Sequence, residues 1–174
     1  MLKLARESIQ SYFSKKQPNI GEYRGKFEAR SGAFVTLTID GELRGCIGYP
    51  LPIYPLWQAV SRAAVAAAVE DPRFPPLTES ELEKISIEVS VLSVPELVQI
   101  KEPSEYLTNI EIGKDGLVIE SGYHSGLLLP QVASEYNWGV EEFLENLCQK
   151  AGLQANAWRA HEVKIYKFQA QIFH

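Results

Sequence analysis

The string LRGCIG at residues 43–48 holds the side chains best suited to chemistry. Cys46 carries a thiol, and a thiolate is a strong nucleophile. Arg44 stands two residues earlier, so both side chains share one face if the segment is a strand. A guanidinium there would favour the thiolate and hold an anionic group. We therefore take Cys46 and Arg44 as candidate catalytic residues.

Two glycines, Gly45 and Gly48, flank this cysteine, although glycine weakens a strand. Close approach of another backbone, a bulge that re-aims a side chain, or close approach of a ligand would each explain them. In the structural interpretation, the glycines admit a packed helix and Cys46 is a small buried residue. In the functional interpretation, the thiol points into a cleft. The sequence leaves both open, and we count both glycines as candidate binding positions.

Two further segments carry polar residues that suit a site. The string DPRFPPL at 71–77 is either a rigid helix exit with Arg73 tied to Asp71, or a second cationic arm. The apolar run 127–130 predicts a buried strand ended by proline, which places Gln131 at the end of a sheet, where polar groups can meet a ligand. Asp71, Arg73 and Gln131 are therefore candidate binding residues.

A nucleophilic cysteine usually needs a base, and the chain offers His124, His161 and His174. His124 lies between two glycines in a predicted loop, whereas His161 is predicted to lie at the surface. The chain has no Cys-x-x-Cys, no His-x-x-x-His and no glycine-rich phosphate motif. We therefore expect no metal and no cofactor.

The elements that must position these residues follow from hydrophobic periodicity and turn residues. The alanine-rich segment 57–70 predicts a closely packed helix that ends before Pro72. Asp40-Gly41 is typical of a two-residue type I′ hairpin turn. The other predicted elements are a helix over 2–13, strands over 33–39, 42–48 and 85–94, helical turns over 80–84 and 104–109, a hairpin of 110–112 with 117–119, a helix over 140–151 followed by Gly152, and a last strand over 163–173.

Pairing Ile39 with Glu42 across the turn sets the expected register of the first hairpin. It places Cys46 opposite Val35. Neither face of this hairpin is plainly polar, so we expect a sheet covered on both sides. Arg44 would then be partly buried, where its charge needs a carboxylate, a carbonyl or a ligand anion.

Composition limits the class of protein. The chain has 174 residues, 45% apolar and 22% charged, which favours one folded domain of the α+β class with a mixed, largely antiparallel sheet. Its net charge of -5, with scattered cations, argues against a nucleic-acid partner. Cys46 and Cys148 form no disulfide framework. No apolar run predicts a signal or a membrane span, so we expect a cytoplasmic protein.

LRGCIG, DPRFPPL, the segment ISIEVSVLS and GLLLPQVASEYNW together resemble the AMMECR domain family over nearly the whole chain. The resemblance implies an α+β fold with a larger and a smaller lobe, and the LRGCIG segment near the cleft between them. It carries the family pattern onto Arg44, Gly45, Cys46 and Gly48, and onto Asp71 and Arg73, while His124 lies outside it. It also implies Memo-like and radical-SAM proteins as partners.

Three hypotheses about function stay open at this point. The chain is an enzyme or enzyme subunit that uses Cys46 as a thiolate in modification chemistry. Alternatively, it is a binding or adaptor module whose cleft holds a small molecule or a protein segment while Cys46 only packs. In the third, the motif serves the packing of hairpin on helix.

Overall fold

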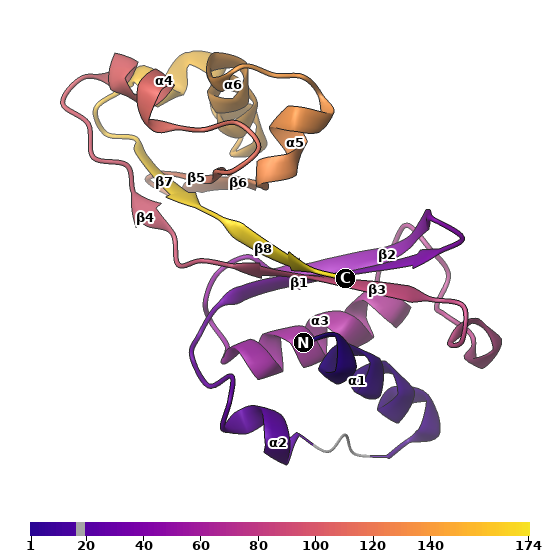
Figure 1. Ribbon diagram of the computed structural model, residues 1–174. Helices are drawn as coiled ribbons and strands as arrows, with labels where there is room; N and C mark the ends of the chain where they lie inside the picture. Colours follow the sequence, from indigo (N-terminus) through magenta and orange to yellow (C-terminus); the bar gives the residue numbers. More distant parts are fainter. Residues whose placement is uncertain (17–19) are drawn as a thin grey trace. The chain divides into compact units, whose positions relative to one another are not determined.

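The computed structural model in Figure 1 describes residues 1–16 and 20–174. The chain forms two compact units, one of residues 1–92 with 171–174 and one of residues 93–170. Each unit has its own four-stranded sheet and its own hydrophobic core. Helices pack on antiparallel strand pairs in both, so the predicted α+β class is confirmed. In the described ranges no helix is long and apolar enough to cross a membrane.

The first unit is a sheet of strand order β2-β1-β3-β8 with two long helices packed together on one face (Figure 1). The buried residues Ala33, Val35 and Leu37 of β1 share a core with both helices. Its elements are α1 (Leu2–Ser14), α2 (Gly21–Arg24), β1 (Gly32–Ile39), β2 (Glu42–Tyr49), α3 (Leu56–Val69), the 3₁₀ turn η1 (Glu79–Glu81), β3 (Ser86–Leu92) and β8 (Ala170–Phe173).

The alanines of α3 bring its backbone very close to β2. A Cβ atom added at Gly45 would lie 2.0 Å from the Ala67 carbonyl oxygen, so no larger residue fits there without a shift of backbone. A different contact leaves room only for glycine at position 48, because an added Cβ would lie 2.3 Å from the Phe34 ring of the neighbouring strand. Close packing of a helix, which the structural interpretation offered for both glycines, therefore accounts for Gly45 alone.

The first hairpin has the predicted turn but not the predicted register. Asp40 and Gly41 have φ of 52° and 85°, as a type I′ turn requires, and Ile39 pairs with Glu42. A β-bulge at Arg44 then shifts the pairing by one residue. Because side chains alternate, one extra residue moves every later position to the other face.

The bulge corrects the expected position of Cys46. This residue pairs with Thr36 instead of Val35, since Gly45 takes the place opposite Leu37. Val35 and Leu37 are fully buried in the core with α3. Cys46 therefore lies on the opposite face of the sheet, beside Thr36.

The second unit is a sheet of strand order β4-β7-β5-β6 with its own helices. Trp158, Phe143, Leu147 and Cys148 are among its fully buried side chains, which confirms Cys148 as a core thiol. Its elements are β4 (Glu96–Leu97), η2 (Pro103–Glu105), α4 (Tyr106–Asn109), β5 (Gly116–Ser121), β6 (His124–Leu128), α5 (Pro130–Glu135), α6 (Val140–Lys150), η3 (Ala155–Arg159) and β7 (Lys164–Phe168).

The predicted hairpin of 110–112 with 117–119 is wrong. Strand β5 pairs with β6 across a turn at Gly122, whose φ is 58°, while residues 110–115 form a turn in which the Asp115 carboxylate accepts the Glu111 N–H at 3.0 Å. His124 is consequently a strand residue and not a loop residue.

One further prediction is confirmed in part, and another needs correction. The strand expected before Pro130 is β6, which ends at Leu128, but Pro130 also begins α5, so Gln131 lies in the first turn of that helix. The single strand expected over 163–173 is two strands, β7 in one sheet and β8 in the other, with Gln169 between them.

Candidate functional site

The main chain of Cys46 is held by the side chains of two residues from the 71–77 string. Strand β2 lies at the edge of its sheet, so its outward N–H and C=O groups need partners other than β1. The Cys46 N–H donates to Asp71 Oδ2 at 2.8 Å, and Arg73 Nη2 donates to the Cys46 carbonyl at 3.3 Å. Asp71 and Arg73 thus take the place of a neighbouring strand at this one residue.

Asp71 is the buried centre of this arrangement. Its side chain is 2% exposed and accepts hydrogen bonds from Arg73 Nε at 3.0 Å, Arg73 Nη2 at 2.7 Å and the Arg73 backbone N–H at 3.1 Å. The Arg73 side chain, followed by the backbone N–H groups of Cys46 and Arg73, holds the pKa of Asp71 well below its usual range, although burial opposes this. Asp71 is therefore ionised at neutral pH.

Arg73 is the exposed partner. Its side chain is 54% exposed. Its pKa is raised first by the hydrogen bonds to Asp71 and also by the charge of Asp71, although burial opposes this. Arg73 is thus the guanidinium that lies at Cys46.

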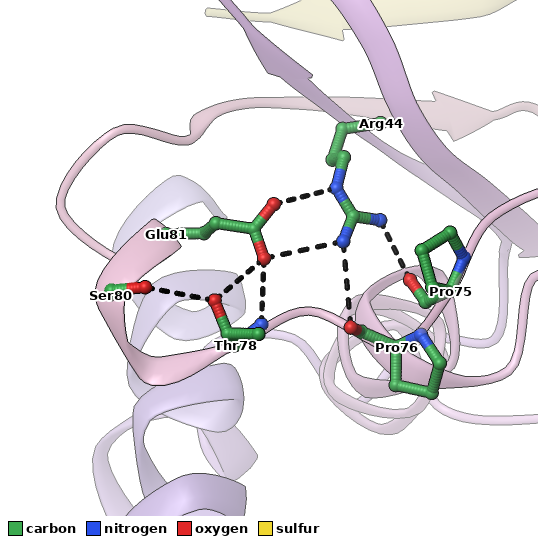
Figure 2. A network of polar contacts seen from close by, with 6 residues as sticks. All are labelled: Arg44, Pro75, Pro76, Thr78, Ser80 and Glu81. Carbon is green, nitrogen blue, oxygen red and sulfur yellow. Dashed lines mark hydrogen bonds and ion pairs between the residues drawn. The ribbon is translucent and has the colours of Figure 1, made fainter.

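Arg44 is bound elsewhere and is mostly buried, with 15% of its side chain exposed. Figure 2 shows its guanidinium between one carboxylate and two backbone carbonyls. Nε and Nη2 donate to Glu81 at 2.9 and 3.3 Å, Nη1 donates to the Pro75 carbonyl at 2.9 Å, and Nη2 also reaches the Pro76 carbonyl at 3.5 Å. A carboxylate and carbonyls therefore meet the expected need of its charge.

Glu81 is held in place by the start of the η1 turn. Its carboxylate accepts hydrogen bonds from the Thr78 backbone N–H and from Thr78 Oγ1, each at 2.8 Å, and Ser80 lies 3.0 Å from the same hydroxyl (Figure 2). The Arg44 side chain, then the Thr78 N–H, lowers the pKa of Glu81 to about 2. Arg44, Glu81 and the 75–76 carbonyls form a second tie between β2 and the segment that follows α3.

Cys46 is a partly exposed residue, in contrast to Cys148, which is buried. Thr36 Oγ1 lies 3.3 Å from the sulfur and donates to it. Helix α3 does not cover this thiol, because Cys46 lies on the other face of the sheet. Burial raises the pKa of the Cys148 thiol, which leaves Cys46 as the candidate for reaction.

Most of the predicted site residues come together in the first unit. Cys46, Asp71 and Arg73 form one contact group, and Arg44 joins the same stretch of chain at a second point. Gln131 belongs to the second unit and stays a predicted binding residue. His124 also belongs to the second unit, and its Nδ1 lies 3.1 Å from the Ala151 carbonyl oxygen.

Sequence reasoning missed two residues at this site, Thr36 and Glu81. Glu81 was recognisable, because Thr78 followed three positions later by glutamate is the signature of a capping box. Thr36 had no such signal, since it is aligned with Cys46 by a bulge at Arg44, and no turn residue or motif in the sequence marks that bulge.

A family model, relatives and a solved structure each match this chain over nearly its whole length. The AMMECR1 family model matches residues 2–173. Protein MJ0810 of Methanocaldococcus jannaschii is 52% identical over 99% of this chain and 87% of its own length, and a protein of Methanothermobacter thermautotrophicus is 48% identical over 100% and 92%. The crystal structure of the uncharacterised protein PH0010 from Pyrococcus horikoshii is similar with a TM-score of 0.85 and 44% identity, over 98% of this chain and 87% of that one. The chain therefore belongs to the AMMECR1 family.

Proposed function

We propose that the chain is an enzyme or enzyme subunit in which the Cys46 thiol is the reacting group. One observation carries the proposal: in the partly exposed residue Cys46, the sulfur accepts a hydrogen bond from the Thr36 hydroxyl at 3.3 Å, while Asp71 and Arg73 hold the main-chain N–H and C=O. A nucleophile held by its own backbone keeps one geometry, which lowers the entropy cost of attack.

In this proposal Arg73 is the group that receives the substrate. Nε and Nη2 are taken by Asp71 and the Cys46 carbonyl, whereas Nη1 makes none of the hydrogen bonds found among the described residues. A half-exposed guanidinium with one open nitrogen suits a carboxylate or phosphate oxygen. Arg44 acts as a positioning residue, because it ties the 75–76 backbone to β2. A reducing, cytoplasmic compartment would keep Cys46 as a thiol.

The test uses two alkylating agents of matched size, neutral iodoacetamide and anionic iodoacetate, on the folded protein. We expect Cys46 to react with both, and Arg73→Ala to slow iodoacetate by several-fold relative to iodoacetamide. Peptide mass spectrometry measures each cysteine, and the buried Cys148 reports unfolding within the same sample. A Cys46 that stays unmodified in folded protein, at a pH about 1.5 units above the ordinary thiol pKa of about 8.5, refutes the proposal.

A second candidate is a binding module in which Cys46 only packs. It is favoured by one observation: in the described part of the chain, the side-chain hydrogen bond of the sulfur comes from Thr36, a hydroxyl, and from no imidazole or carboxylate. The probe is inorganic phosphate, and its binding is followed by the NMR signal of the backbone N–H of residue 73, which the Arg73→Ala variant keeps. This version predicts a phosphate-dependent shift that Cys46→Ser retains and Arg73→Ala abolishes, and a shift lost in Cys46→Ser contradicts it.

A further inference from the structure

Three side chains on three adjacent strands form a row across the sheet face that carries Cys46. Thr36 of β1 lies opposite Cys46 of β2 on one side and opposite Glu88 of β3 on the other. Residues directly opposite each other in a sheet have Cβ atoms about 4.5–5.5 Å apart and project to the same face. Thr36 is therefore the shared neighbour of a thiol and a carboxylate.

The chemistry of the three groups suits transfer of a proton along this row. The Thr36 hydroxyl already bonds the sulfur at 3.3 Å. A hydroxyl donates one hydrogen and accepts two, so it can take a proton from one neighbour while it gives its own to the other. The Glu88 side chain is 34% exposed, and its Oε2 lies 3.4 Å from Nδ1 of His174.

We infer that Glu88 is the proton acceptor for Cys46 and acts through Thr36. The inference rests on the proposed function and supplies the base that this function requires. The Thr36 hydroxyl, which donates to the sulfur in the structure, turns to donate to the Glu88 carboxylate and to accept from the S–H group. As the sulfur bonds an electrophilic carbon, the S–H proton passes to Thr36 Oγ1 and the former hydroxyl proton passes to the Glu88 carboxylate. The leaving group departs from the carbon with its electron pair, and no oxidant or reductant takes part.

The Glu88 carboxylate also has an effect that slows the reaction of Cys46 instead of speeding it. A carboxylate near a thiol, without proton transfer, disfavours the thiolate by charge repulsion. The other titratable or charged groups at the row are His174, which lies against Glu88, and the Asp71–Arg73 pair at the Cys46 main chain. The Asp71–Arg73 pair does not contact Glu88 among the described residues, so the sign of the effect of Glu88→Gln separates a proton acceptor from a repelling charge.

The experiment measures the rate of Cys46 alkylation by iodoacetamide from about pH 6 to pH 10 in the intact protein. We expect Glu88→Gln and Thr36→Val to lower the rate at least about tenfold near pH 6, where the thiol needs help to lose its proton, and to leave it unchanged near pH 10. Glu88→Asp should restore part of the rate. Glu28→Gln, an exposed carboxylate of the same unit, is the matched control and should have no effect.

The outcomes distinguish this inference from the proposed function. A Cys46 that reacts normally, with a Glu88→Gln rate equal to or above that of the natural protein near pH 6, overturns the inference and leaves the proposed function standing. An equal loss of rate at every pH also overturns it, because a purely structural role of Glu88 would change access to the thiol regardless of ionisation. An unreactive Cys46 in the natural protein overturns both.

Discussion

Replacing Glu81 by glutamine should remove the ion pair that anchors Arg44. The carboxylate takes two guanidinium hydrogen bonds and two from Thr78, and its pKa is lowered to about 2 from an ordinary value of 4.5. Such a pKa difference corresponds to about 3 kcal/mol of stability at neutral pH. Glutamine keeps one acceptor oxygen, and the pair is partly exposed, so we expect a loss of about 2 kcal/mol.

The pH dependence of this loss follows from the direction of the pKa shift. A group whose pKa is lowered by folding stabilises the protein above its unfolded pKa, and this contribution disappears as the pH falls through its folded pKa. For Glu81 the contribution is complete above about pH 5 and fades towards pH 2. Glutamine does not titrate, so the difference between the two proteins should shrink over the same interval.

Urea unfolding of both proteins at neutral pH and at about pH 3 measures this difference. Glu79→Gln is the matched control, because Glu79 is an exposed carboxylate of the same turn that makes no ion pair among the described residues. Equal urea midpoints for Glu81→Gln and the natural protein at neutral pH would refute the reasoning. So would a loss that is the same size at both pH values, since it would not come from the ionised carboxylate.

Two other substitutions test how β2 is held. Gly45→Ala should cost about 1–3 kcal/mol, because the added Cβ would meet the Ala67 carbonyl at 2.0 Å, whereas Gly25→Ala, in open space, should cost nothing measurable by urea unfolding. Equal stability of the two alanine variants would contradict the close approach of α3. Asp71→Asn should speed hydrogen exchange at the Cys46 amide by at least about tenfold, since an amide oxygen accepts that N–H less strongly than a carboxylate. An unchanged exchange rate, measured by NMR, would mean that Asp71 does not hold this backbone group.

The two ties on β2 explain why the LRGCIG and DPRFPPL strings occur in one chain. The first tie joins Cys46 to Asp71 and Arg73, and the second joins Arg44 to Glu81 and the backbone between them. Both lie along the open edge of the sheet, where unpaired backbone groups would otherwise face solvent. The two arginines thus differ in role, because one is mostly buried in its tie and the other is half exposed.

Local patterns were sufficient for the elements with strong short-range signals. The turn at Asp40-Gly41 was predictable because both positions need positive φ, and the end of α3 because proline excludes helix from the residue before it. The periodicity of 140–151 likewise predicted α6 and the buried Cys148. Such signals act within a few residues, so a sequence shows them directly.

Tertiary structure decided everything that depends on contacts distant in sequence. Whether Gly113 or Gly122 marks the second hairpin depends on which strand pairs with β5, and the register at Cys46 depends on a bulge beside Ala67. One inserted residue reverses the face of every side chain beyond it, so no local pattern could place the thiol beside Thr36. The residue types of the candidate site are thus evident in the sequence, while their partners, Asp71 with Cys46 and Glu81 with Arg44, are set by the packing of β2 against α3 and the segment after it.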